Sequence, residues 1–436
     1  MLKSAVPSVA LLALFAFGAQ AINVPTAKLD NNRSGLTLSE TVLTLANVNS
    51  NTFGKVFERS AVGDMYPQPL IVEALSIGGG THNLVFLATA NNNVYAYDAT
   101  VASNTVPYWT RNLGTPVPAT DVDCCCTDVA LNVGIMGTPV IDVASKTIYL
   151  VARNKNPDAT YHQWLHALDI TTGAEKFGGP KEITATYPGT GSGSVGGLLT
   201  FDAKIQNQRS GLLLQGGRLF ITWASHNDCG NYHGWVMAYD PGTLNQLAAW
   251  MTTPNGAKGG VWMSGGGLVG DGNNLYFSTG NGDSDVGSGG GSDYGQCFVG
   301  LNNSLGVATW FQSGFYRTLN TGDKDLGGAG VQLIPGTRLL VSGGKDGKIY
   351  LLNADTMGGY GGNRVDACVQ TFTAASGHFH SGPVTFNSPA GTLTYVCAEG
   401  DYLKAFKLVN GLYQTTPYWT GFKAPTGMPG AQNWIS

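Results

Sequence analysis

The stretch Val-Tyr-Ala-Tyr-Asp at residues 94–98 is the first of six copies of one short phrase. Each copy is a short strand-like run that in most copies ends in a small residue and a large hydrophobic residue, followed by Asp or Asn. An aromatic residue follows after a turn. The other copies lie at residues 165–169, 236–240, 298–302, 349–353 and 403–407, and the aromatic residues are Trp109, Phe177, Trp250, Trp310, Phe372 and Trp419. Self-similarity at a spacing of roughly 50 to 70 residues indicates a unit that buries its faces against its neighbours.

Each phrase is predicted to be the third strand of a four-stranded unit. A short β-branched and aromatic run precedes it, as at residues 218–223, and an inner-strand candidate such as residues 137–142 comes earlier still. The segment that carries the aromatic residue supplies the fourth strand. The composition, with 43% hydrophobic residues, 12% charged residues and 62 glycines, favours buried strands and tight turns. We therefore predict an all-β fold, a β-propeller of four-stranded antiparallel blades.

Six blades can be read from the sequence, and the closure of their ring is an open question. A seventh, partial blade begins at residues 427–431, but its strands do not appear before Ser436. A propeller must close, because an open ring leaves sheet edges in water. Residues 54–60 are predicted to supply an outer strand that completes the final blade. The alternatives are a ring with fewer blades and a truncated product.

The N-terminus has the three zones of a secretory signal peptide. Lys3 is followed by an apolar run through Phe17 and by Ala-Gln-Ala at residues 19–21. We predict a signal peptide over 1–21 and a single propeller domain over 22–436, secreted to an extracellular or periplasmic space. The apolar run is too short for a permanent membrane span. The net charge of −4 provides no positive electrostatic field that would attract nucleic acid. Seven cysteines in an exported chain predict disulfides.

The phrases resemble the tryptophan-docking motifs of quinoprotein alcohol dehydrogenases and of secreted PQQ-repeat proteins. The dehydrogenases are eight-bladed propellers that hold pyrroloquinoline quinone (PQQ) and a calcium ion on the ring axis. The resemblance covers nearly the whole chain after residue 21. It implies a truncated eight-bladed propeller, with PQQ and calcium as cofactors.

Several segments are similar to the quinone-binding residues of this family. Cys125 and Cys126 look like the adjacent cysteines whose disulfide ring covers one face of the quinone. Trp262, in Gly-Val-Trp at residues 260–262, looks like the indole that stacks on the other face. Lys345 lies where a basic residue contacts the quinone. The resemblance therefore implies that these four residues bind the cofactor.

The metal and catalytic positions of the family also have candidates. The resemblance implies that Asn281 and Asp228 bind calcium and that Asp325 is the catalytic base. A hard cation held by carboxylate and amide oxygens can act as a Lewis acid, and a carboxylate can remove an alcohol proton. The chain departs from the family where Asp228 stands near the position of a Glu ligand and where the Trp expected beside Asp325 is absent.

Each candidate also has a plainer interpretation. One of the three cysteines at residues 124–126 could instead pair with Cys229, and Trp262 could be an ordinary filler between blades. Asn281 lies in a Gly-rich loop where turn formation alone favours Asn. His378 and His380 share one face of an extended segment. No Cys, Asp or third His at a suitable spacing completes a metal set with them, so a structural or surface role is predicted.

The leading hypothesis is a secreted PQQ- and calcium-dependent oxidoreductase that acts on a small-molecule substrate, an alcohol or a similar reduced compound. The chain has no Cys-x-x-Cys-His haem attachment sequence, so its electron acceptor would be a separate molecule. The alternative is a non-catalytic propeller scaffold that binds a protein or a glycan, because fold alone does not fix function.

Overall fold

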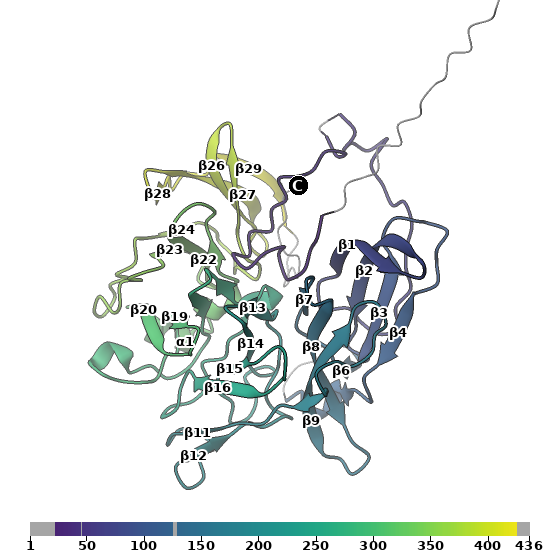
Figure 1. The fold of residues 1–436 in the computed structure, drawn as a ribbon. Helices are drawn as coiled ribbons and strands as arrows, with labels where there is room; N and C mark the ends of the chain where they lie inside the picture. The colour runs from purple at the N-terminus through teal and green to yellow at the C-terminus, as the bar shows by residue number, and fades with distance from the viewer. Residues whose placement is uncertain (1–21, 45, 125–128, 425–436) are drawn as a thin grey trace, which may run out of the picture.

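The computed structural model describes residues 22–44, 46–124 and 129–424, and its strands form six main antiparallel sheets (Figure 1). We number these sheets as blades one to six along the chain. Blade one contains β1 (Leu70–Ile77), β2 (Gly80–Ala88), β3 (Asn93–Asp98) and β4 (Trp109–Asn112). Blade two contains β7 (Val140–Asp142), β8 (Thr147–Lys155), β9 (Tyr161–Asp169) and β10 (Lys181–Glu182). Blade three contains β13 (Leu213–Gln215), β14 (Arg218–Trp223), β15 (Trp235–Tyr239) and β16 (Gln246–Met251).

The last three blades repeat the same order. Blade four contains β17 (Val269–Gly270), β18 (Asn274–Ser278), β19 (Cys297–Asn302) and β20 (Val307–Gln312). Blade five contains β21 (Gln332–Leu333), β22 (Leu339–Gly343), β23 (Lys348–Asn353) and β24 (Gln370–Thr373). Blade six contains β25 (Val384–Ser388), β26 (Gly391–Val396), β27 (Tyr402–Val409), β28 (Leu412–Tyr413) and β29 (Trp419–Lys423), with β28 and β29 both paired to β27. The predicted fold class is confirmed.

Short elements occupy the connections between these strands. Two small antiparallel pairs are formed by β5 (Val117–Pro118) with β6 (Asn132–Val133) and by β11 (Thr186–Pro188) with β12 (Leu198–Thr200). The helical elements are η1 (Ala119–Asp121), η2 (Met263–Gly265), η3 (Val286–Ser288), α1 (Tyr316–Thr321) and η4 (Leu326–Gly328). The connections after the second and fourth strands of each blade lie at the same end of the fold, because neighbouring strands are antiparallel.

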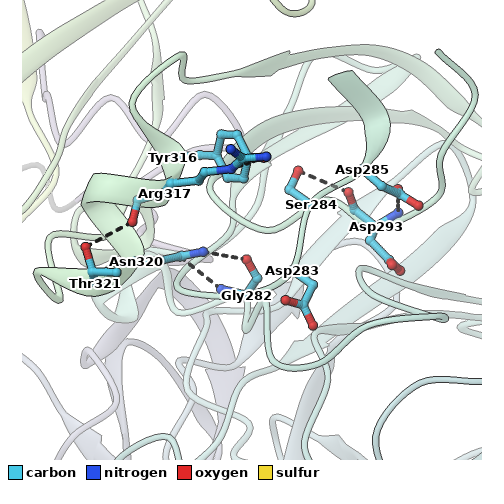
Figure 2. A pocket seen from close by; sticks show the side chains of 9 residues that line it. All are labelled: Gly282, Asp283, Ser284, Asp285, Asp293, Tyr316, Arg317, Asn320 and Thr321. Carbon is cyan, nitrogen blue, oxygen red and sulfur yellow. Dashed lines mark hydrogen bonds between the residues drawn. The ribbon is translucent and has the colours of Figure 1, made fainter. Parts of the chain in front are cut away.

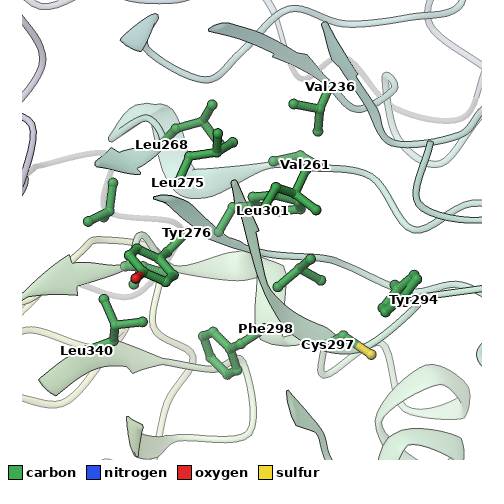
Figure 3. Close-up of a cluster of buried hydrophobic side chains, with 14 of the residues drawn as sticks. Val236, Val261, Leu268, Leu275, Tyr276, Tyr294, Cys297, Phe298, Leu301 and Leu340 are labelled. Carbon is green, nitrogen blue, oxygen red and sulfur yellow. The ribbon is translucent and has the colours of Figure 1, made fainter. Parts of the chain in front are cut away.

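The core lies between consecutive blades. Every residue of β15 is buried, because blade three is covered by a neighbour on each face. One hydrophobic cluster joins blades one and two, a second joins two and three, a third runs from three to five, and a fourth joins five and six. Figure 3 shows the third cluster, in which Val236 of blade three, Leu275 and Phe298 of blade four, and Leu340 of blade five contribute side chains. Blade-to-blade packing therefore supplies the burial that one sheet lacks.

The tryptophans that end the repeats were predicted to pack between blades, and three of them do. The Trp109 indole donates a hydrogen bond of 2.9 Å to the carbonyl oxygen of Ile170 in blade two. Trp250 of blade three packs against Phe277 and Tyr294 of blade four. Trp310 is half-buried against the same cluster.

The prediction that these tryptophans pack between blades is wrong for Trp419. Its side chain is 47% exposed and contacts Tyr395 of its own blade. The reason is its place in the chain, because among residues 22–44, 46–124 and 129–424 no further blade follows β29. The predicted seventh blade at residues 427–431 lies outside the described residues.

The N-terminal segment, residues 22–36, joins the inner strands of the blades. Its main chain exchanges hydrogen bonds with Ile71 of β1 and accepts bonds from Ile141 of β7, Gly270 of β17 and Leu333 of β21. Asn31 Nδ2 donates to Leu214 of β13, and Lys28 Nζ donates to Pro383, next to β25. Each partner belongs to the exposed edge of a sheet or lies beside it, so this segment caps edges that would otherwise face water. In Figure 1 it runs between blade one and blade six.

The prediction that residues 54–60 pair with the final blade is wrong. These residues form no strand, and they lie against blade one. The Arg59 guanidinium donates to carbonyl oxygens of Asp98 and Val101, and the Tyr97 hydroxyl donates to the carbonyl oxygen of Ser60. Among the described residues, blade six and blade one share no direct hydrogen bond, and residues 22–36 provide the link between them.

Candidate functional site

The described candidate residues all lie at one end of the fold. Asp228, Asn281 and Lys345 follow the second strands of blades three, four and five, which are β14, β18 and β22. Trp262 and Asp325 precede the inner strands of blades four and five, β17 and β21. Because both kinds of connection open at the same end, residues up to 117 positions apart can meet there. Cys125 and Cys126 lie outside the described residues.

Gly280 is the point at which Trp262 and Asp325 meet. A Cβ atom placed on Gly280 would lie 2.7 Å from Nε1 of Trp262 and 3.3 Å from Oδ2 of Asp325. A Cβ atom on Gly260 would also lie 2.9 Å from Nε1 of Trp262. Real Cβ contacts are not this short, so the absence of a side chain at residue 280 permits the approach. The structure thus brings Trp262, Asp325 and the residue before Asn281 together.

Asp325 and Lys345 form a buried ion pair at this point. Lys345 Nζ lies 2.7 Å from Oδ1 of Asp325, whose side chain is 4% exposed, and 3.2 Å from Oδ1 of Asp323. Burial raises the pKa of the Asp325 carboxyl, although the charge of Lys345 opposes this. Burial also disfavours the charged Lys345, but Asp325 and Asp323 outweigh it and raise the pKa of the ammonium group. A carboxylate with a raised pKa is a stronger base than an ordinary one.

Asn281 is held by two partners that the sequence did not indicate. Its amide Nδ2 donates to Oδ1 of Asp323 at 2.7 Å, and its Oδ1 accepts from Nε2 of Gln296 at 2.8 Å. The Gln296 side chain also accepts from the backbone N–H of Leu326 at 3.1 Å. Gln296 therefore links the loops that carry Asn281 and Asp325. Its place just before β19 gave no signal, because one glutamine before a strand has no distinctive pattern.

Asp228 is linked to Trp262 through Tyr232. The Tyr232 hydroxyl donates to Oδ1 of Asp228, and the Tyr232 ring meets the Trp262 ring edge-on at 6.4 Å. Lys258 Nζ is 3.6 Å from Oδ2 of Asp228. The charge of Asp228 contributes to the raised pKa of Asp325. Asp228 thus belongs to the same neighbourhood, and Tyr232 was missed because its role depends on the fold of one loop.

A disulfide joins this region to the cysteine triplet. Cys124 is bonded to Cys229, which follows Asp228 directly. This pairing confirms that one member of the triplet bonds to Cys229, and it ties residue 124 to the loop after β14. A closed loop of this length, with a sequence separation of 105, removes much freedom from the unfolded chain.

A hollow of about 470 Å³ opens next to Asn281 (Figure 2). Its lining begins at Gly282, which Asn320 of α1 holds through both its N–H and its carbonyl oxygen. Asp283, Asp285 and Asp293 also line it, together with Tyr316 and Arg317 of α1. Burial of Asp293, together with repulsion from Asp285 and Asp283, raises the pKa of its carboxyl group. Most of this lining could not be anticipated from the sequence, because α1 lies in a segment without a helical hydrophobic pattern.

The comparisons with known proteins concern the fold. No family model matches the chain, and no curated protein matches it. Among solved structures, a quinohemoprotein alcohol dehydrogenase from Comamonas testosteroni is 14% identical, with a TM-score of 0.56 over 88% of this chain. A quinohemoprotein alcohol dehydrogenase from Pseudomonas putida is 13% identical, with a TM-score of 0.55 over 92% of this chain. A europium-containing methanol dehydrogenase is 15% identical, with a TM-score of 0.57 over 91% of this chain.

These likenesses show a propeller fold of the quinoprotein-dehydrogenase type. The chain spans 58% and 61% of the lengths of the first two structures, and 72% of the third. At such identities the shared property is the fold, and the chemistry has to be argued from the residues. In the part of the chain that the structure describes, we find no helix with the length and apolar character that crossing a membrane requires.

Proposed function

We propose that this chain is a quinoprotein-type oxidoreductase whose site lies around Gly280, with PQQ and calcium as its cofactors and an alcohol or similar reduced compound as its substrate. The observation that carries the proposal is the convergence of an indole from blade four with a buried carboxylate and an ammonium group from blade five. Trp262 and Asp325 meet beside Gly280, which leaves room for their approach, and Lys345 pairs with Asp325. A structural ion pair alone would not need the indole.

The residues fit such a pair of cofactors in three respects. Asp228, Asn281 and Asp323 offer carboxylate and amide oxygens, the ligands that calcium prefers. Trp262 offers an indole on which a flat quinone can stack. Oδ1 of Asp325 is buried and has no hydrogen-bond donor beyond its ion pair with Lys345. Buried polar atoms are usually hydrogen-bonded, so this oxygen is suited to an additional partner.

The chain's own groups then have distinct tasks. When bound, the quinone supplies a two-electron acceptor and the cation polarises it. Trp262 orients the flat ring, and Gly280 keeps the space beside the indole open. Asp325 accepts the hydroxyl proton of the substrate at a carboxylate oxygen, helped by its raised pKa. Lys345 holds this carboxylate in place through the 2.7 Å ion pair.

Export fits the same proposal. A long-range disulfide such as Cys124–Cys229 forms and persists in oxidising spaces outside the cytoplasm. We therefore keep the secreted or periplasmic location, with a signal peptide at residues 1–21, as part of the proposed function. Electrons would leave to a separate acceptor.

One observation favours the alternative, a non-catalytic scaffold that binds a protein or a glycan. Asp228 already accepts from Tyr232, and the Asn281 oxygen already accepts from Gln296, so a cation has to compete with these bonds. The two functions are separated by an activity test. Protein reconstituted with PQQ and Ca²⁺ is assayed for alcohol-dependent reduction of a dye acceptor, with Asp325→Asn as the test variant and the exposed Asp158→Asn as its control. Turnover that is lost only in Asp325→Asn supports the oxidoreductase, and no turnover with any alcohol supports the scaffold.

A further inference from the structure

Three potential metal ligands meet at the sixth blade, outside the quinone site. His378 and His380 lie in the connection from β24 to β25, and Glu399 lies in the connection from β26 to β27. One ligand atom of each residue falls within 4.8 Å of the other two. These two connections are one repeat further along than those of Asp325 and Lys345. Blade six thus places nitrogen and oxygen donors where blade five places an ion pair.

The backbone holds the two histidines in position. Between them, Phe379 is 1% exposed and fills the space beside Gly343, where a Cβ atom would lie 2.6 Å from its ring. Alternate residues of an extended segment point to one side, so with Phe379 in the core both imidazoles point away from it. The Glu399 N–H donates to the carbonyl oxygen of His378 at 2.9 Å and joins the two loops.

The distances favour a shared ion over direct hydrogen bonds. Oε2 of Glu399 lies 3.5 Å from Nε2 of His380 and 4.0 Å from Nδ1 of His378. Two ligands of one tetrahedral Zn²⁺, with bonds of about 2.0–2.1 Å, lie roughly 3.3 Å apart. By contrast, two other His–Glu pairs of this chain touch directly, at 2.5 Å for His162 with Glu182 and 2.6 Å for His166 with Glu175.

His380 carries the strongest sign of an additional partner. Its imidazole is 11% exposed, and its Nε2 atom is buried without any hydrogen-bond partner. A buried nitrogen without a hydrogen-bond partner destabilises the fold, and an ion at this position would remove that cost. His378 and Glu399 are 43% and 31% exposed, so an ion could enter from solvent.

We propose that His378, His380 and Glu399 bind a divalent transition-metal ion of the Zn²⁺ class, with a coordination position left open to water or a ligand. Two imidazoles and one carboxylate form a donor set typical of open Zn²⁺ sites, whereas calcium prefers oxygen ligands alone. The nearby Lys345 is balanced by Asp325 and Asp323, so its charge does not stand alone against the ion. This site is separate from the proposed calcium site and is independent of the proposed function.

Co²⁺ is the probe that tests this site. The full chain, stripped with a chelator, is titrated with Co²⁺ alone, and visible absorbance and calorimetry are recorded. We expect one equivalent to bind with a spectrum of nitrogen and oxygen ligands, and Zn²⁺ to displace it. His380→Ala and His378→Ala should each weaken binding at least about tenfold. Losing a metal ligand should cost at least as much as losing an outer-shell contact, which weakens metal affinity about 10- to 100-fold. His162→Ala, at the directly bonded pair, is the matched control and should change nothing.

The two histidine variants keep the test decisive. His378 is partly exposed, so His378→Ala should retain the native melting temperature even if His380→Ala does not fold. Trp262→Ala should leave Co²⁺ affinity unchanged, which separates this site from the quinone site. The proposal is overturned if no Co²⁺ binds, if His378→Ala binds as the native chain does, or if the spectrum shows intense thiolate bands, which would place the ion on cysteines.

Discussion

Gly280 controls how closely Trp262 approaches Asp325. A methyl group at residue 280 would lie 2.7 Å from Nε1 of the indole, so Gly280→Ala should displace Trp262. We expect the variant to fold and to lose at least about tenfold in quinone affinity, because misplacement by about 1 Å is costly at a preorganised site. Gly54→Ala is the control, since a Cβ atom at residue 54 meets nothing within 4 Å. Equal quinone affinity in both variants would argue against a role for the indole.

Lys28 should leave a signature in the pH dependence of stability. Burial lowers the pKa of its ammonium group to about 7, from 10.5 in the unfolded chain. The folded chain therefore binds fewer protons than the unfolded chain between these values, and the stability present above pH 10.5 is lost as the pH falls toward 7. Between about pH 8 and pH 10, the unfolding free energy of the native chain relative to Lys28→Met should rise by on the order of 1 kcal/mol per pH unit. Denaturant titrations of both proteins measure this difference, and a constant difference would rule out the lowered pKa.

The repeat-ending tryptophans give a matched pair of positions in two blades. Trp250 is 7% exposed between blades three and four, whereas Trp419 at the start of β29 is 47% exposed. Trp250→Ala should cost about 3–5 kcal/mol of unfolding free energy, the usual range for a buried Trp. Trp419→Ala should cost less than about 1 kcal/mol. Chemical denaturation of both variants checks this, and equal losses would mean that the exposed face of blade six is covered in solution.

The strands were predictable because their signals are local. The phrase at residues 236–240 is a short apolar run that ends in a turn, and the structure forms β15 there with its bounds shifted by one residue. The meeting of Trp262 with Asp325 was expected from the family resemblance, but the glycine that permits it was not. Likewise, Glu399 lies 19 residues beyond His380, in the connection from β26 to β27, so its approach to the histidines depends on the pairing of β25, β26 and β27. Contacts between two loops can be predicted only when the pairing and register of the strands that carry the loops are known, and no local sequence pattern gives that register.

The N-terminal segment was the least predictable part of the whole fold. Residues 22–36 have no repeat phrase and no strand period, and they join the blades mainly through backbone and buried polar contacts. Arg33 shows why: it is fully buried, and its guanidinium donates to carbonyl oxygens of Leu268 in the loop before β17 and Leu212 in the loop before β13. Such contacts appear only when the blades are already arranged around the segment.

Arg33 should accordingly stabilise several blades together. Arg33→Ala leaves the carbonyl oxygens of Leu212 and Leu268 buried without this donor, at about 1–3 kcal/mol each. We expect a loss of roughly 2–5 kcal/mol in a single cooperative unfolding transition. Arg317→Ala, at an exposed position of α1, is the control and should change stability by less than about 0.5 kcal/mol. A native melting curve for Arg33→Ala would show that the segment does not hold the blades.

The end of the propeller around Gly280 is the proposed binding site for a quinone. The most direct measurement is an equilibrium absorbance titration of the purified chain with PQQ in the presence of Ca²⁺, repeated with Trp262→Ala and with Trp419→Ala as the control indole. Aromatic stacking is worth about 1–3 kcal/mol, so we expect saturable binding near one equivalent that Trp262→Ala weakens about 5- to 150-fold and Trp419→Ala leaves unchanged. Absence of saturable binding, or equal affinity in both variants, would contradict the quinone site and favour the binding scaffold.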